Sequence, residues 1–265
     1  MVLKGKEIED LGQFAIEVIR GSGEKALSYY GKGRHQIKFD EGLVTEAEIQ
    51  LTEFFQDQLQ ARFPEHQIFK NNQEDHEYTH EGKKSMWIFD PLDGVANFQA
   101  GIPIWGMSLA LIENFWPVFG VFYMPATGDL FQAQAGNKAF RGKNEIRISA
   151  QESINNESLL LTYSRFYQHY RSTFPGKIRG LGCAAAHMCY VAMGRAEACI
   201  IANESYRGLA AACIIVDSAG GKTSRMDGSD FFLNEYLDGT KIDEHLLVAS
   251  PDTSSQVREC LQKIS

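Results

Sequence analysis

The first 62 residues carry apolar side chains at helical spacing and predict two helices. In the first helix, apolar residues recur every three or four positions from Ile8 onward, and the run Gly21-Ser22-Gly23 should kink or break it. In the second, Thr45 and Glu48 form a capping box, so this helix should begin there and end near Arg62, ahead of a proline.

From residue 86 the pattern changes to short apolar runs separated by turn residues, which is typical of strands. We expect antiparallel strands over residues 86–89, 106–113, 117–123 and 130–135. The second half alternates strands and helices, which we expect over 159–162, 183–193, 198–201, 209–219 and 246–249, with a last helix after Pro251. The fold class is therefore α+β (α/β mixed), with sheets and helices stacked in layers.

Composition and charge exclude several classes of protein. The 265 residues are 44% hydrophobic and 23% charged, which fits one compact unit with an α+β subdomain over 1–150 and an α/β subdomain over 151–265. A net charge of -8 argues against a nucleic-acid partner. The five cysteines form no C-x-x-C pair, and the chain shows neither a signal-peptide core nor an apolar run of ~18 residues, so we expect a cytoplasmic protein without a membrane segment.

Two carboxylates follow the apolar run 86–89, at the expected end of a strand. Asp90 and Asp93 are three residues apart, and Pro91 and Gly94 force the chain to turn around them. A carboxylate pair held this closely favours a hard divalent cation. Taken alone, these residues fit an ordinary Asp-Pro and Asp-Gly turn better than a cation site.

Three segments together resemble the inositol monophosphatase family. They are the run Trp-Ile-Phe-Asp-Pro-Leu-Asp-Gly over 87–94, the pair Asn97-Phe98, and the triplet Ala219-Gly220-Gly221. The resemblance covers nearly the whole chain. It implies a layered α-β-α-β-α fold, a homodimer, and Mg²⁺-dependent hydrolysis of small phosphate monoesters.

The same resemblance implies a metal site whose ligands are only partly present here. Asp90, Asp93 and the carbonyl group of Leu92 match the family's ligands. An acid expected upstream falls on Asn71, a weak ligand, and an aspartate expected downstream falls on Gly208, where that ligand is lost. Two negative charges stand where the family has four, so we expect one weakly bound Mg²⁺ at most, or none.

The positions implied for water activation and substrate binding depart as well. The family's threonine or serine after Asp-Gly is Val95, which has no hydroxyl group, and its substrate-binding glutamate is Ile201. The backbone amides of Gly94 and Val95 could still receive a phosphate at a helix start, and Cys183 and Ala184 occupy segments near the family's substrate. If lost metal and lost water activation each cost ~10²-fold, hydrolysis should fall by at least about four decades.

Arg207 introduces a cation at the start of a predicted helix, where the helix dipole disfavours it. Asp90 or Asp93 would stabilise it there, and its guanidinium group could also hold a phosphate. An arginine that points into solvent accounts for the sequence equally well. Glu48 occupies an acidic position of the family, although its capping role explains it fully.

A competing motif lies at residues 76–80, which read His-Glu-Tyr-Thr-His and match the H-E-x-x-H pattern of zinc proteases. The flanking residues 71–75 and 81–84 are polar and offer no apolar stripe to bury a catalytic helix. We therefore interpret this segment as a solvated loop, with adventitious metal binding or a lid over the pocket as weaker alternatives.

The sequence leaves two functional hypotheses. In the first, phosphatase activity is strongly impaired or lost, and the protein binds a small phosphate ester or acts as a regulatory partner. In the second, it is a slow phosphatase of inositol or sugar monophosphates that uses one Mg²⁺, with Glu74 or Glu48 recruited as a further ligand.

Overall fold

The structure is a computed structural model that describes residues 5–33, 41–69, 85–114 and 116–264. Its helices are α1 (Gly5–Leu27), α2 (Glu41–Arg62), α3 (Val95–Ala100), α4 (Phe166–His169), α5 (Ala184–Ala192), α6 (Tyr206–Ser218) and α7 (Pro251–Glu259), with a 3-10 turn η1 (Leu233–Tyr236). Within the described ranges, no helix combines the length and apolar character needed to cross a membrane.

The strands form three sheets. A seven-stranded sheet has the order β1 (Gln67–Ile68), β2 (Met86–Asp93), β3 (Gly106–Glu113), β4 (Trp116–Met124), β5 (Asp129–Gln134), β6 (Ala139–Arg141) and β7 (Asn144–Ile146). A five-stranded sheet has the order β10 (Lys177–Arg179), β8 (Leu159–Thr162), β11 (Ala198–Ile201), β13 (Leu246–Ala249) and β12 (Lys222–Arg225), and β14 (Leu261–Lys263) pairs with β9 (Tyr170–Ser172).

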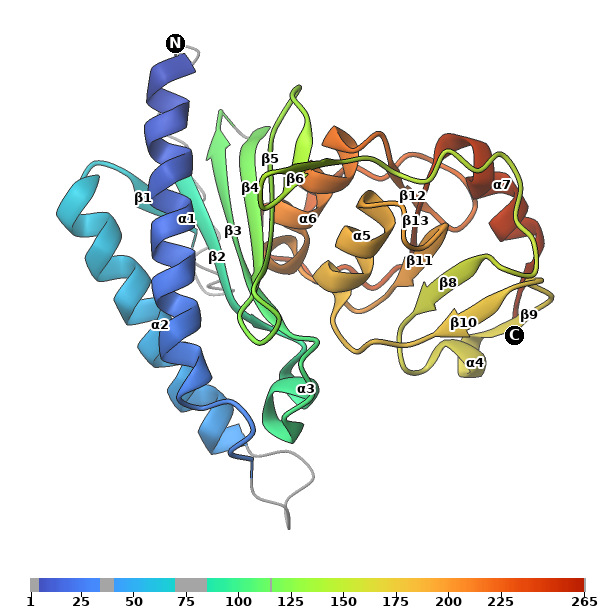
Figure 1. The fold of residues 1–265 in the computed structure, drawn as a ribbon, viewed down its shortest axis with the longest axis horizontal. Helices are drawn as coiled ribbons and strands as arrows, with labels where there is room; N and C mark the ends of the chain where they lie inside the picture. Colours follow the sequence, from blue (N-terminus) through green and yellow to red (C-terminus); the bar gives the residue numbers. More distant parts are fainter. Residues whose placement is uncertain (1–4, 34–40, 70–84, 115, 265) are drawn as a thin grey trace.

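The elements stack as α-β-α-β-α, which confirms the expected fold. Helices α1 and α2 cover one face of the seven-stranded sheet, and α5 and α6 lie between the two large sheets (Figure 1). Phe166 of α4 and Val257 of α7 pack on the outer face of the five-stranded sheet. The expected division into subdomains at residue 150 stays a prediction.

Strand β2 shows why a strand in this arrangement needs a continuous apolar run. Trp87 and Phe89 pack toward α1 and α2, whereas Met86 and Ile88 pack toward α5 and α6. Because successive side chains alternate between faces and both faces are covered by helices, every position must be apolar. Pairing of β2, β3, β4 and β5 is antiparallel, as predicted.

The predictions for the two N-terminal helices need correction. Helix α1 continues through Gly21 and Gly23 instead of breaking there. Glycine at these positions makes room for neighbouring rings: an added Cβ atom would lie 2.9 Å from the Phe54 ring at the first position and 2.5 Å from the Tyr123 ring at the second. Helix α2 begins at residue 41, so Thr45 lies inside it and the expected capping box was wrong.

Helix α6 is held very close to the seven-stranded sheet. A Cβ atom added to Gly120 on β4 would lie 2.7 Å from the Ala211 carbonyl oxygen, so only glycine permits this approach. At the start of α6, the Ser205 side chain accepts a hydrogen bond of 3.1 Å from the Gly208 N–H. The cap and the close packing fix where the first turn of α6 lies.

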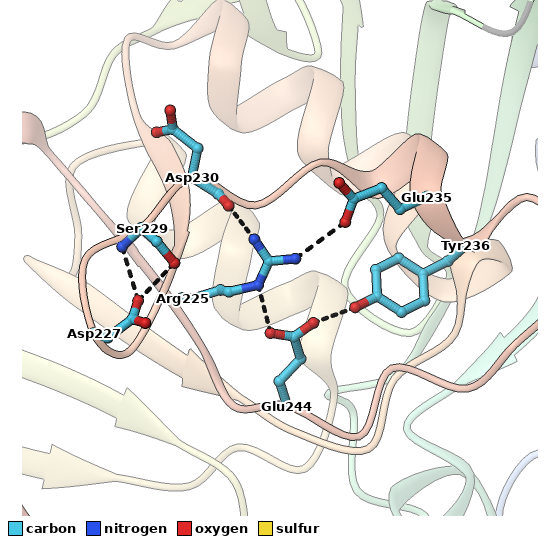
Figure 2. Close-up of polar contacts among 7 residues, drawn as sticks. All are labelled: Arg225, Asp227, Ser229, Asp230, Glu235, Tyr236 and Glu244. Atoms are coloured by element: carbon cyan, nitrogen blue, oxygen red, sulfur yellow. Dashed lines mark hydrogen bonds and ion pairs between the residues drawn. The ribbon is translucent and has the colours of Figure 1, made fainter.

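The segment between β12 and β13 is organised around Arg225 (Figure 2). Its guanidinium group donates to Glu244 at 2.6 Å, to Glu235 at 3.1 Å and to the carbonyl oxygen of Asp230. The Tyr236 hydroxyl group also donates to Glu244. These contacts anchor η1 and its flanking loops to the edge of the second sheet, and none of these residues belongs to the site predicted from the sequence.

Candidate metal and phosphate site

The two predicted acids lie at the end of β2, and a strand irregularity brings them to the same side. Asp90 pairs with Ser108 and Asp93 pairs with Gly106, so β2 contains one residue more than β3 between these two pairs. On a regular strand, residues three apart would face opposite sides of the sheet. The additional residue, next to Pro91, forms a bulge that turns the Asp93 carboxylate to the same side of the sheet as that of Asp90.

Asp93 reaches the first turn of α5. Its carboxylate accepts hydrogen bonds from the backbone N–H groups of Ala185 at 2.7 Å and Ala184 at 3.3 Å, and from the Cys183 thiol at 3.2 Å. The N–H of Gly94, which has a φ of 83° and precedes α3, also donates to it. The Gly94 amide, one of the two predicted to bind phosphate, therefore donates to Asp93 in this structure.

Arg207 points into this site, one of the alternatives that the sequence left open. Its Nε atom lies 3.5 Å from Asp90 Oδ1, and the Arg207 side chain remains 39% exposed. Glu48 of α2 is also close enough to Arg207 and Asp90 to interact with both charges. Glu48 is half-buried inside a helix, so its interpretation as a capping residue was wrong.

Glu204 is an acid of this site that sequence reasoning missed. A Cβ atom added to Gly208 would lie 3.1 Å from Glu204 Oε2 and 3.6 Å from Asp90 Oδ2, so both oxygens approach the same point. The available signal was an acid four residues ahead of the vacant position 208, directly before the Ser205 cap. Glu204 thus adds a third acid near Asp90, while the expectation that too few acids converge here to hold two magnesium ions stays a prediction.

The remaining predicted residues divide between the site and the undescribed segments. Val95 is the first residue of α3, half-buried and without a hydroxyl group. Asn71, Glu74 and the His-Glu-Tyr-Thr-His motif at 76–80 lie outside the described residues. The five cysteines are free thiols, as expected, and burial raises the pKa of Cys183, so it is no ready nucleophile.

Burial dominates the electrostatics of the three acids. It raises the pKa of Asp90 to about 6, with Arg207 opposing the shift and Asp93 adding to it. Burial also raises the pKa of Asp93, against the N–H donors that favour its charged form. The pKa of Glu204 rises to about 8, first through burial and then through the charges of Asp93 and Asp90. A cation bound among them would relieve these unfavourable effects.

The oxygen atoms gathered here are of the kind that a magnesium ion binds. Within the described part of the chain, no three acid, histidine or cysteine side chains are gathered closely enough to hold an ion by themselves. Magnesium, however, is usually bound by one or two carboxylates together with water and substrate phosphate. The oxygens of Asp90 and Asp93 and the Leu92 carbonyl group are hard ligands of this kind.

A separate cleft of about 740 Å³ lies at the other end of α6, against η1. It is lined by Trp116, Asp217, Phe232 and other residues of that region, and by none of the predicted site residues. Burial raises the pKa of Asp217 to about 6. The cleft is therefore separate from the predicted site.

Comparisons with known proteins agree with the fold and identify the family. A family model described as "Inositol monophosphatase family" matches residues 7–258. A histidinol-phosphatase from Chlorobaculum parvum is 32% identical over 219 residues, covering 79% of this chain and 83% of the relative. A Nus factor SuhB from Xylella fastidiosa is 33% identical over 155 residues, covering 55% of this chain and 56% of the relative. A solved IMPase from Thermotoga maritima has a TM-score of 0.77 and 25% identity, covering 95% of this chain and 96% of that chain. The chain belongs to the inositol monophosphatase family.

Proposed function

We propose that the protein is a Mg²⁺-dependent hydrolase of a small phosphate monoester. The observation that carries the proposal is the bulge in β2, which turns the carboxylates of Asp90 and Asp93 to one side beside the start of α5. The proposal is also supported by the relatives named as phosphatases, including the histidinol-phosphatase.

In this proposal the residues divide the work by their chemistry. Asp90, Asp93 and the Leu92 carbonyl group would hold one Mg²⁺, which would offset negative charge on the phosphoryl oxygens. The Val95 amide and the Arg207 guanidinium group would bind the phosphate. Cys183 would line the site without reacting, because its thiol is buried and donates to Asp93.

The sequence alone favours lost activity, because it leaves only two acids at the site. Glu204 adds a third acid next to Asp90, and this favours the second hypothesis, an active enzyme. We expect slow turnover, since Val95 has no hydroxyl group to relay a proton from the attacking water.

A second candidate is a protein that binds a phosphate ester without turning it over. It is favoured by Arg207, whose Nε atom lies 3.5 Å from Asp90 and supplies positive charge where a metal would otherwise do so. One relative is named as a Nus factor rather than as a phosphatase. Both candidates include the homodimer expected from the resemblance, which sedimentation equilibrium of the purified chain tests.

Phosphate release from a panel of monoesters separates the two candidates. The panel should contain inositol, histidinol and sugar phosphates, each assayed with MgCl₂ and with excess EDTA. The enzyme proposal expects EDTA-sensitive release that falls at least about 100-fold in Asp93→Asn. The matched control is Asp57→Asn, at an exposed position on α2, which should keep the wild-type rate.

The contrary result is equally distinct. Folded wild-type protein that releases no phosphate from any ester, yet binds one of them in calorimetry without Mg²⁺, would replace the enzyme proposal with the binding proposal.

A further inference from the structure

Gly208 leaves a space beside Asp90 that another residue enters. A side chain at position 208 would begin 3.6 Å from Asp90 Oδ2. The carboxylate of Glu204 already lies at this place, with Oε2 3.1 Å from the point where the Cβ atom of residue 208 would stand. The carboxylate of Glu204, four residues earlier in the chain, therefore lies close to where a side chain at position 208 would contact Asp90.

The backbone around Glu204 is fixed on both sides. Its carbonyl oxygen accepts a hydrogen bond of 3.0 Å from the Ile242 N–H, in an isolated bridge between the two segments. The next residue, Ser205, caps α6 through Gly208. Asn203 has a φ of 59°, a left-handed conformation that turns the chain from β11 toward this cap. The Glu204 side chain thus starts from a well-defined position.

The surroundings of the Glu204 carboxylate call for a cation. The carboxyl group lies deep among protein atoms, although part of the residue still reaches solvent. Within the described residues it accepts no hydrogen bond and makes no ion pair, and the charged groups that influence it are Asp93 and Asp90. Arg207 pairs with Asp90 instead. A carboxylate that is enclosed, faces two others and has no counterion of its own is unfavourable until a further positive charge joins them.

We propose that Glu204 supplies the carboxylate that Gly208 lacks, and that Asp90 and Glu204 together bind the Mg²⁺ of the proposed phosphatase. This inference rests on the proposed function. It assigns a ligand from outside the family's pattern. The acid comes four residues earlier in the chain than the family's aspartate, but its carboxylate lies next to the place of a side chain at position 208. The site then does not depend on Asp90 and Asp93 alone.

Magnesium binding itself, measured by isothermal titration calorimetry on the full chain, tests the assignment. In Glu204→Gln the affinity for Mg²⁺ should fall at least about 10-fold, since glutamine keeps the shape but offers no charge. Glu259→Gln, at an exposed position on α7, is the matched control and should bind as the wild type does. Thermal unfolding of each variant verifies that the protein is folded during the titration.

A swap of the two positions gives the sharper result. Glu204→Ala should lose binding, and Glu204→Ala combined with Gly208→Asp should recover the wild-type affinity to within about threefold, because an acid then stands again near the same point. A gain of binding on adding the second substitution cannot come from misfolding.

Two outcomes would overturn the inference. One is equal Mg²⁺ affinity of wild type and Glu204→Gln; a raised KM of that variant for esters with an amine-bearing alcohol would then make Glu204 a substrate contact. The other is failure of the double variant to recover binding lost in Glu204→Ala. Wild-type protein that neither binds Mg²⁺ nor releases phosphate would instead count against the proposed function itself.

Discussion

The carboxylate of Asp93 accepts a hydrogen bond of 2.7 Å from the backbone N–H of Ala185, ninety-two residues later in the chain. Asp93 ends a strand of the first sheet, and Ala185 lies in the first turn of α5, between the two sheets. One side chain thus serves the proposed metal site and also satisfies N–H groups that have no partner within the helix.

The capping role of Asp93 can be separated from its proposed metal role by stability. Asp93→Asn keeps an oxygen that accepts from the Ala185 N–H, whereas Asp93→Ala removes it, so the asparagine variant should be more stable by about 1 kcal/mol. Urea unfolding of the metal-free protein at pH 7 measures the difference. Both variants should lose phosphate release. Equal stability of the two would show that the hydrogen bonds to α5 contribute little.

Asn97 connects the same two parts of the chain through its amide group. Its Nδ2 atom donates to the carbonyl oxygens of Ile104 and Leu181, both at 2.6 Å. Asn97→Asp would replace both donors by an acceptor beside two carbonyl groups, so the free energy of unfolding should fall by at least about 2 kcal/mol. Urea unfolding measures the loss, and the exposed Asn137→Asp should change stability by less than about 0.5 kcal/mol. A small effect at Asn97 would mean that water replaces its donors.

The buried strands could be predicted from sequence, and the edge strands could not. The expected bounds of β3, β8, β11 and β13 agree with the structure, because continuous apolar runs end at turn residues there. Edge strands such as β10 and β12 are short and carry charged residues at both ends, Lys177 and Arg179 in one and Lys222 and Arg225 in the other, so no apolar run marks them.

The candidate site shows the same limit. Asp90 and Asp93 could be found because strand and turn residues surround them in the sequence. Glu204 could not, because a left-handed residue, a cap and a distant hydrogen bond together decide where its carboxylate lies. Such placement depends on tertiary contacts, which no local pattern encodes.

Arg207 should compete with the metal and assist the phosphate. In Arg207→Gln the affinity for Mg²⁺ should rise about two- to fivefold, because a partly exposed ion pair with Asp90 contributes about 0.2–1 kcal/mol. The KM for phosphate esters should rise in the same variant, since a guanidinium donor is lost. Calorimetry and initial rates measure the two effects, with the exposed Arg195→Gln as control. If neither the Mg²⁺ affinity nor the KM changes, Arg207 affects neither the metal nor the phosphate.

Val95 should limit turnover. Val95→Thr places a hydroxyl group at the first residue of α3, after Asp93 and Gly94, and kcat for phosphate release should rise at least about 10-fold if that group relays a proton. Val95→Ala changes the side chain without adding a hydroxyl group and should show no such gain. If both substitutions change kcat equally, side-chain size rather than proton transfer is the cause.

His187 should make the folded state sensitive to acid. The residue is 2% exposed, its Nε2 atom accepts a hydrogen bond of 2.9 Å from the Leu181 N–H, and burial lowers the pKa of His187 to about 4. The unfolded chain, with a histidine pKa near 6.5, binds the proton first as the pH falls. Stability from the neutral ring is therefore present above about pH 6.5 and is lost on acidification toward pH 4, by roughly 3 kcal/mol in all.

The comparison of wild type with His187→Gln isolates this effect, because glutamine can accept from Leu181 but does not titrate. Asp90 and Asp217 act in the opposite direction: burial raises the pKa of each to about 6, so their contribution is largest in acid and is lost as the pH rises through 6. Both proteins share these groups, so their effect cancels in the difference. Urea unfolding between pH 4 and 7 should show the wild-type advantage shrinking as the pH falls. A constant difference would mean that folding leaves the pKa of His187 unchanged.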